Sequence, residues 1–374
     1  MDTNYHLADV LQRFLPGYKQ RYALSDRQAL TCQHIQACRT PKLGSQQWQC
    51  DTCGYEQVHY CSCRDRHCPR CQGQKSQEWV AKQQAQVING QYFHLVFTLP
   101  HELNVVSQYA PKGLYTALFQ AVWQTLSQFS GNRHKARGQL GVTMILHTWG
   151  QTLSQHIHLH CLVPGGVLTG EGKWIGVKGK YLYPVKALST VFRAKMMAAL
   201  RAQNVVPPQD EVIMAKPWSV YSKPSLTNPD TVIKYLARYT QKGMMHESRL
   251  THVTETEVGF HYKDYRHPEK RKAMCLSGEE FIRRYLLHVL PKGFMRIRHY
   301  GYLANRCRRR KLRVIKAQTQ VNPQGQFRPE PEEKAKQPTV CWSCPECKAG
   351  ELKLVSLTLP ERLEFNRTRK KLAG

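Results

Sequence analysis

Residues 155–166, QHIHLHCLVPGG, have the pattern of one β-strand followed by a turn. Apolar and histidine side chains alternate along the stretch, and a period of two is typical of a strand with one buried face. The sequence therefore predicts a packed face and an open face on this strand. The packed face would hold Ile157, Leu159, Cys161 and Val163, and the open face His156, His158 and His160.

The open face of this strand has the chemistry of a metal site. Side chains two residues apart on a strand share a face, with Cα atoms ~7 Å apart, so neighbouring imidazoles can converge on one cation. We predict that His158 and His160 are metal ligands. Three ligands along one straight strand span too far for one ion, so His156 is a third ligand only if the strand bends, and otherwise contacts substrate. The alternative is a half-exposed strand with incidental histidines, which three histidines in register with four apolar residues disfavour.

The charge of the chain indicates a polyanionic partner. The 374 residues include 55 Lys and Arg against 26 Asp and Glu, a formal net charge of +29. Aromatic residues are interleaved with the basic ones, and the sequence has no long apolar run that would span a membrane. Nucleic acid is therefore the expected partner rather than a lipid bilayer. The length is sufficient for two or three domains.

The cysteines are expected to bind zinc. The first residues, MDTNYHLADV, lack a basic segment followed by an apolar one, so we expect no signal peptide, a cytoplasmic location and reduced thiols. Each C-x-x-C pair forms a tight thiolate knuckle, and two knuckles complete a tetrahedral structural site. Unliganded thiols are the alternative. The two pairs are Cys50 with Cys53 and Cys68 with Cys71; a second ion would draw on Cys38, Cys61, Cys63 and His67, with Cys32 or His34 in reserve.

The ligand set of each zinc ion is not determined by the sequence. A third group of thiols, at Cys341, Cys344 and Cys347, has knuckle spacing but no evident fourth ligand nearby. Residues 317–338 before it are polar and rich in proline, as in a linker. We therefore expect one or two structural zinc ions near the N-terminus and a separate cysteine-containing tail.

Strands and helices alternate through the middle of the chain, which favours an α/β or α+β sandwich around one sheet. Residues 92–99 are predicted to form a strand, and 111–129 an amphipathic helix that packs on the core. His94 would be a third metal ligand if its strand lies beside the histidine strand. The ordinary alternative for a single histidine is packing or substrate contact.

A predicted helix begins after Asn228, a plausible N-cap, and ends near Gly243. Val232 lies on its predicted buried side. Tyr235 and Tyr239, four residues apart, share the edge of that side, where Arg238 and Lys242 flank them. Aromatic residues at this spacing usually serve packing. Beside cations and a metal site, however, a tyrosine hydroxyl is a competent nucleophile toward a phosphate.

A dense basic segment follows at residues 296–313. We predict that its arginines contact DNA phosphates, the alternative being a solvated helix face. Arg238 and Lys242 on the tyrosine helix are expected to do the same. The arginines of the segment itself are Arg296, Arg298, Arg306, Arg308, Arg309 and Arg310.

Together these pieces resemble the HUH rolling-circle transposases of the IS91 insertion-sequence family, over nearly the whole chain to about residue 313. The HUH element, histidine-hydrophobic-histidine, corresponds to residues 158–160, and the family's tyrosine pair to Tyr235 and Tyr239. Five motifs in the same order make the resemblance specific. They are SCRDRHCPRCQ, FHLVFTLPHEL, HTWGQTLSQHIHLHCLVPGG, YLARYT and LPKGFMRIRHYGYLANR.

The resemblance implies an α+β fold with an HUH-type central antiparallel sheet flanked by helices. An N-terminal zinc-binding domain would occupy residues 1–90 and the catalytic domain residues 91–300. A basic segment, linker and cysteine-containing tail would follow at residues 301–374.

The resemblance also implies a transposase that acts on single-stranded DNA at transposon ends and target. Mg²⁺ or Mn²⁺ at His158, His160 and a third ligand would orient the scissile phosphodiester. A tyrosine would attack it to give a 5′-phosphotyrosine and a free 3′-OH. No nucleotide hydrolysis is expected, because the sequence lacks GxxxxGK[ST]. The alternatives are a related HUH replication initiator or relaxase, and a zinc-dependent DNA-binding protein without catalysis.

Overall fold

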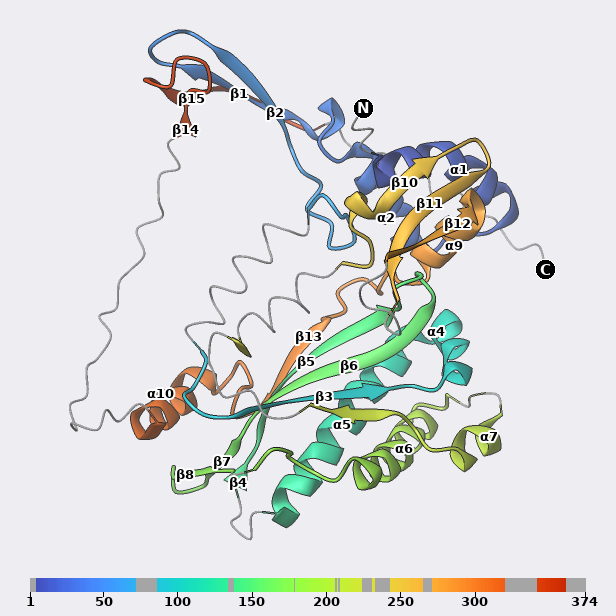
Figure 1. Cartoon of the computed structure of the whole chain (residues 1–374), viewed down its shortest axis with the longest axis vertical. Coiled ribbons are helices and arrows are strands. Elements are labelled where there is room, and N and C mark those ends of the chain that lie inside the picture. Colours follow the sequence, from blue (N-terminus) through green and yellow to red (C-terminus); the bar gives the residue numbers. More distant parts are fainter. Residues whose placement is uncertain are drawn as a thin grey trace.

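The computed structural model describes residues 5–71, 86–133, 138–177, 179–205, 207, 209–223, 231–232, 243–264, 271–319 and 342–360. These residues form an α+β fold with antiparallel sheets, as the sequence predicts (Figure 1). The helices are α1 (Leu7–Arg21), α2 (Asp26–Ala37), α4 (Val106–Tyr109), α5 (Pro111–Arg133), α6 (Val185–Arg201), α7 (Asp210–Ala215), α9 (Gly278–Leu286) and α10 (Arg308–Thr319), with 3-10 turns η1 (Pro41–Leu43), η2 (His101–Asn104) and η3 (Glu247–Arg249).

The strands form four sheets. In chain order the strands are β1 (Ser45–Cys50), β2 (Glu56–Tyr60), β3 (Tyr92–Thr98), β4 (Gly138–Gln139), β5 (Gly141–Trp149), β6 (Gln155–Pro164), β7 (Gly166–Thr169), β8 (Trp174–Gly176), β9 (Val220–Ser222), β10 (Leu250–Val253), β11 (Glu257–Lys263), β12 (Arg271–Ser277), β13 (Ile297–Gly301), β14 (Trp342–Ser343) and β15 (Glu351–Thr358). No helix within the described ranges is both long enough and apolar enough to cross a membrane.

The central sheet has five strands in the order β13-β5-β6-β3-β9, and every neighbouring pair is antiparallel. The histidine strand β6 lies in the middle. On one side His158 is paired with His147 of β5, and on the other side with Thr98 of β3. Two residues further along β6, His160 is paired with Ile145 and Val96. The register thus places β5 and β3 side chains beside the histidines.

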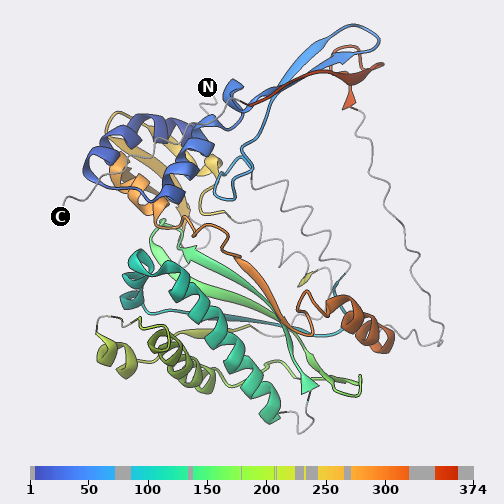
Figure 2. The same ribbon diagram turned by 180° about the vertical axis from the view of Figure 1, so that it is seen from behind.

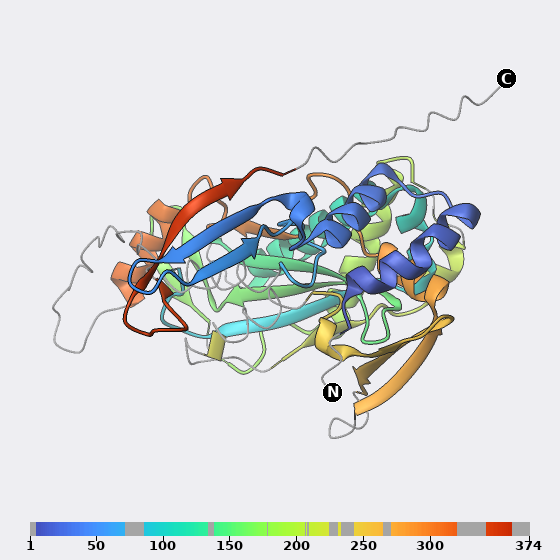
Figure 3. The same cartoon turned by 90° about the horizontal axis from the view of Figure 1, so that it is seen from above.

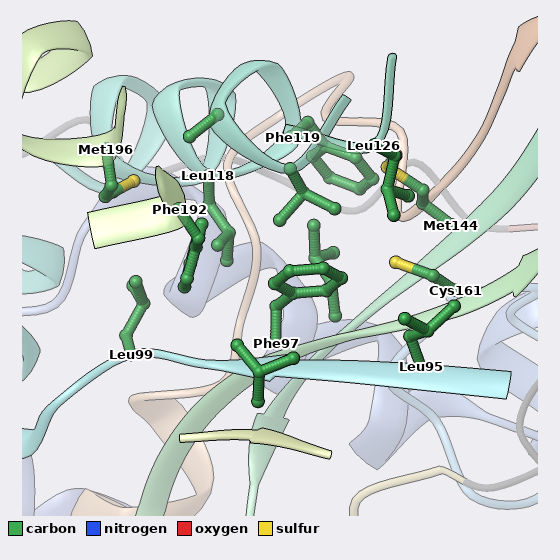
Figure 4. Close-up of a cluster of buried hydrophobic side chains, with 14 of the residues drawn as sticks. Leu95, Phe97, Leu99, Leu118, Phe119, Leu126, Met144, Cys161, Phe192 and Met196 are labelled. Carbon is green, nitrogen blue, oxygen red and sulfur yellow. The ribbon is translucent and has the colours of Figure 1, made fainter. Parts of the chain in front are cut away.

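One face of this sheet is packed against α5 and α6, which lie across it (Figure 2). The four apolar residues predicted for the packed face of β6 are at most 1% exposed, so that prediction is confirmed. Figure 4 shows Leu95, Phe97 and Cys161 directed toward α5 and α6. Burial of each such large apolar side chain stabilises the fold by about 1.5–3 kcal/mol. The packing therefore fixes which face of β6 carries the histidines.

The opposite face of the sheet is partly covered by a second apolar cluster. Ile145 and Leu162 of the sheet belong to it, together with Leu312 and Ile315 of α10. Val232, from the helix predicted to hold the tyrosines, is fully buried in the same cluster. The cluster therefore lies on the face that carries the histidines, beside them.

The N-terminal helices pack with a segment that is distant in the sequence. α1 and α2 share a core with the three-stranded sheet β10-β11-β12 and with α9 (Figure 1). Ser25 caps α2 by accepting a hydrogen bond from the Gln28 N–H, as expected from the sequence. Residues 243–264 and 271–286 thus pack with the N-terminal helices. The domain boundaries expected from the sequence, at residues 90 and 300, assign these segments to the catalytic domain instead.

A four-stranded sheet, β14-β15-β1-β2, projects from the N-terminal helices (Figures 1 and 3). β15 is antiparallel to β1 from Ser45 opposite Thr358 to Cys50 opposite Leu352, with a register shift between Gln47 and Trp48. The sequence suggested a separate tail, but the described part of the tail pairs with the N-terminal strands. It is one half of a sheet whose other half is N-terminal.

A single glycine permits the close approach of β5 to the ring of Tyr302. A Cβ atom at Gly141 would lie 2.4 Å from the Tyr302 ring, and Tyr302 is fully buried and has no space to move away. We expect Gly141→Ala to lower the free energy of unfolding by about 1–3 kcal/mol through overpacking. Urea denaturation would measure the change. Gly170→Ala is the matched control, because nothing lies within 4 Å of the added atom; an equal loss in both variants would contradict this account.

Candidate metal centres

Three histidines of the central sheet form a compact cluster. They are His147, His158 and His160, and one ligating nitrogen from each lies within 4.8 Å of the others. The Nε2 atoms of His158 and His160 are 3.1 Å apart. Two nitrogens bound ~2.1 Å from one ion at ~90–110° lie ~3.0–3.4 Å apart. The geometry of this pair therefore fits a shared metal ion.

Hydrogen bonds orient the rings of this cluster. Nδ1 of His158 donates to the His156 carbonyl at 2.8 Å, so its Nε2 is directed into the cluster. Nδ1 of His160 lies 3.0 Å from Nε2 of His94, and this contact orients the His160 ring. Partners of this kind usually set the tautomer and orientation of metal-ligating histidines.

Burial keeps the imidazoles of His158 and His94 neutral. Burial, and then the charge of His156, lower the pKa of His158 to about 4. Burial, and then Lys223 and His158, lower the pKa of His94 to about 3. A neutral imidazole is the form that binds metal, so the site needs no deprotonation at neutral pH.

The third member of the cluster is His147, which the sequence analysis did not single out. His156, expected to be a ligand only if its strand bends, is exposed and lies outside the cluster. His94 does lie on a neighbouring strand, but its ring contacts His160 rather than the cluster centre. The turn at residues 150–154 folds β5 back on β6 and sets His147 opposite His158. Recognition of that hairpin in the sequence would have identified His147.

The two tyrosines proposed as nucleophiles, Tyr235 and Tyr239, lie outside the described residues. The same holds for Arg238 and Lys242. The described residues nearest to them in sequence are Val232, three positions before Tyr235, and Gly243.

The first cysteine cluster contains Cys38, Cys63, Cys68 and Cys71, beside the N-terminal helices. The Sγ atom of Cys71 is 3.5 Å from that of Cys38 and 3.6 Å from that of Cys63. These separations are far too long for disulfides and are close to the ~3.7 Å between thiolates on one tetrahedral zinc. Hydrogen bonds from the neighbouring thiols, that of Cys38 first, lower the pKa of Cys71. A thiolate is the form that binds zinc.

The second cluster joins the two ends of the chain. Cys50 and Cys53 meet Cys344 and Cys347, with Sγ–Sγ distances of 3.7 Å for the pairs Cys50–Cys347 and Cys53–Cys344. Backbone N–H groups of Gly350 and Ala349 lower the pKa of Cys347 to about 6. A Cβ atom at Gly350 would lie 2.5 Å from the Cys50 sulfur, so only glycine leaves space for the knuckle. Both clusters suit closed, structural zinc sites.

Two sequence expectations about these ligands are corrected. Cys50-x-x-Cys53 does not share a site with Cys68-x-x-Cys71; it is completed by the tail, because β15 pairs with β1. His67 is not a ligand either. Its Nδ1 lies 2.9 Å from Asp65 and its Nε2 accepts the Leu290 N–H at 3.2 Å, so both ring nitrogens have partners.

Sequence comparisons agree with this architecture. The family described as "Transposase zinc-binding domain" matches residues 10–99, and the family described as "Putative transposase" matches residues 141–311. The chain is 37% identical over 326 residues to "Putative transposase y4qJ" of Sinorhizobium fredii (strain NBRC 101917 / NGR234), covering 82% of each protein. It is 28% identical over 300 residues to "Transposase for insertion sequence element IS801" of Pseudomonas savastanoi pv. phaseolicola, covering 76% of this chain and 72% of that protein.

The chain belongs to the IS91 family of transposases. No solved structure is significantly similar to this transposase. The segment that matches the zinc-binding family contains the whole first four-cysteine cluster and two cysteines of the second, which Cys344 and Cys347 complete. The histidine cluster offers a further metal site.

The predicted DNA-binding arginines of the transposase occupy different environments. The Arg298 guanidinium stacks 4.4 Å from the ring centre of Phe119 and 4.7 Å from that of Phe294, on the sheet face opposite the histidines. Arg298 is half-buried there, and its contact with phosphate stays a prediction. Arg296 lies over the Trp149 ring, and burial lowers its pKa to about 10. Arg306, Arg309 and Arg310 are exposed, and Arg308 is partly buried.

The composition of the histidine cluster predicts which histidine substitutions weaken Mn²⁺ binding. We expect His147→Ala to weaken Mn²⁺ binding at least tenfold, because it removes one of three converging imidazoles. His156→Ala should leave Mn²⁺ affinity within a factor of about three, since this exposed ring is outside the cluster. Mn²⁺ titration followed by electron paramagnetic resonance would measure both. Equal effects of the two substitutions would contradict this assignment.

The shared cysteine cluster predicts a change in zinc content. The double variant Cys344→Ser with Cys347→Ser should bind one zinc ion less than the parent protein, because two of four ligands are lost. Elemental analysis of the purified protein would measure it. Cys307→Ser is the control, since Cys307 belongs to none of the candidate metal groups among the described residues. An unchanged zinc content in the double variant would show that Cys344 and Cys347 do not bind zinc.

Proposed function

We propose that this transposase cleaves and joins single-stranded DNA at the histidine cluster in a rolling-circle type of transposition. The single observation that carries the proposal is the convergence of His147, His158 and His160 on one point of the sheet. All three belong to the segment that matches the transposase family. Neutral, oriented imidazoles on a rigid sheet are suited to hold a divalent cation against a phosphodiester.

The proposed reaction uses a tyrosine as the nucleophile. Mg²⁺ or Mn²⁺, when bound, would neutralise charge on the scissile phosphate and orient it for in-line attack. The hydroxyl oxygen of Tyr235 or Tyr239 forms a bond to phosphorus, and the bond from phosphorus to the 3′-oxygen breaks. The products are a 5′-phosphotyrosine and a free 3′-OH. The second tyrosine can then cleave or accept another strand before the first end is released.

The burial of Val232 supports the choice of these tyrosines. Val232 is fully buried in the cluster that covers the histidine face of the sheet, together with Ile145 and Leu162. Ile145 is paired directly with His160. The chain therefore enters the tyrosine segment, three residues before Tyr235, on the side of the sheet where the proposed metal site lies.

The basic helix α10 supports DNA as the substrate. It packs on the same face through Leu312 and Ile315, so its outward side flanks the histidine cluster. Arg309, Arg310 and Arg313 are exposed on that outward side. Cations near the site would attract and hold a polyanionic strand. We propose that the enzyme acts in the cytoplasm on DNA of the nucleoid, with structural zinc at both cysteine clusters.

The nucleophile assignment predicts a covalent adduct. Incubation with a labelled single strand from the element's end and Mn²⁺ should give a protein–DNA species that survives a denaturing gel. Tyr235→Phe combined with Tyr239→Phe should abolish it, because no phenol remains to attack, while the affinity for the strand stays within about threefold.

Two controls make this test specific. Tyr109→Phe removes an exposed phenol on α4, away from the histidine face, and should leave the adduct unchanged. An adduct in the double variant would overturn the assignment of these tyrosines. Loss of the adduct in Tyr109→Phe would show that the assay reports on general damage.

A further inference from the structure

A small pocket lies on the histidine face of the sheet, next to the proposed catalytic site. Its polar side chains include those of Gln86, Thr143, His299 and Arg308, and its apolar ones those of Leu162 and Leu303. Thr143 and Leu162 are paired across β5 and β6, and His299 of β13 is paired with Thr143. The pocket therefore spans three neighbouring strands and the start of α10.

The pocket is sized for a phosphate group. Its volume is about 30 Å³, and it is open to solvent on one side. A water-sized atom needs about 10–15 Å³ of such space, so two or three fit. The two non-bridging oxygens of a phosphodiester satisfy this limit, whereas a nucleobase with its ring atoms does not.

The polar atoms around the pocket include several hydrogen-bond donors. The Thr143 hydroxyl lies 2.9 Å from Nδ1 of His299. If Thr143 donates to that nitrogen, the ring carries its proton on Nε2. The Gln86 amide and the Arg308 guanidinium are donors as well.

Arg308 is a partly buried cation on α10. Within the ranges that the structure describes, it forms no ion pair, and burial followed by repulsion from Arg309 lowers its pKa. Partly buried cations are normally paired. An anion at the pocket mouth would supply the missing partner.

The pocket lies at a suitable distance from the histidine cluster. Along β5 the row of Thr143 is two residues from that of Ile145 and His160, and four from that of His147 and His158. At ~3.4 Å per residue these steps amount to ~7 and ~14 Å. Successive phosphates of an extended single strand are about 6–7 Å apart, so one or two nucleotides span the gap.

We propose that this pocket binds a backbone phosphate of the DNA strand, one or two nucleotides from the scissile phosphate. The inference rests on the proposed function, because it takes the histidine cluster as the point of cleavage. Arg308 and His299 bind the phosphate oxygens, Thr143 positions His299, and the apolar side chains of the pocket accept the adjoining deoxyribose. The site recognises the backbone and not the base, so it sets the register of the strand without reading sequence.

The test replaces single phosphates in the strand by neutral methylphosphonates. The probe is a labelled 12-nucleotide single strand from the element's end, with no added divalent metal, and binding is followed by fluorescence anisotropy. In the parent protein one position, one or two nucleotides from the cleaved bond, should weaken binding about tenfold, the loss expected for a charged hydrogen bond. Arg308→Ala should bind about tenfold more weakly and show no further loss at that position.

Arg309→Ala is the matched control, since it removes the same charge from the next residue of α10, where the side chain is exposed. It should retain the full tenfold penalty. If the melting temperature shows that Arg308→Ala is unstable, Gln86→Leu is tested in its place. In that variant the methylphosphonate penalty should be reduced at the same position only. A penalty that persists in Arg308→Ala, or is lost equally in Arg309→Ala, would overturn the inference.

This test is separate from that of the proposed function. Binding is measured without cleavage, so a penalty coupled to Arg308 in a protein that forms no tyrosine adduct would support the phosphate pocket and reject the nuclease mechanism. An adduct that forms normally, without coupling between Arg308 and any phosphate, would reject the pocket alone.

Discussion

The antiparallel pairing of β5 with β6 is the constraint on which the rest of this transposase depends. The turn at residues 150–154 fixes the register, and that register sets His147 beside His158 and one row away from His160. A shift by one residue would turn every histidine of β6 into the apolar core and every apolar side chain outward. Burial of the apolar face under α5 and α6 prevents such a shift, so the energy of the core also holds the metal site in place.

The two faces of the central sheet divide structure from chemistry. One face is closed by two long helices and contains even the guanidinium of Arg298, stacked on aromatic rings. Among the described residues, the other face is covered by α10 and by the chain at Val232. The pocket lies beside α10 and Arg308, and the histidine cluster lies one and two rows further along β5 and β6. A basic helix that contributes both apolar anchors and exposed cations is an economical way to flank a site for a charged strand.

The second cysteine cluster brings together two segments that lie far apart in the chain. Cys50 and Cys347 are 297 residues apart and meet in one four-sulfur cluster. The projecting sheet β14-β15-β1-β2 has only a small buried cluster of its own, formed around Cys50, Cys344 and Leu352. A sheet with so small a core depends on its metal for stability, as small zinc modules do. Zinc would therefore stabilise both the sheet and the attachment of the tail.

The sequence by itself determined the local pattern. The strict alternation in residues 155–163 revealed which face of the strand is buried, and C-x-x-C spacing revealed thiol knuckles, because both depend on neighbours a few residues apart. Only the tertiary structure decided which distant groups meet. His147, and not His156, is the third imidazole of the cluster. His67 is hydrogen-bonded to Asp65, and Cys344 and Cys347 complete the cluster of Cys50 and Cys53. Strand pairing made the first and the last of these choices: the β5–β6 hairpin placed His147 in the cluster, and β15 beside β1 brought in Cys344 and Cys347. Pairing of β1 with a strand as distant in the chain as β15 leaves no spacing rule in the sequence.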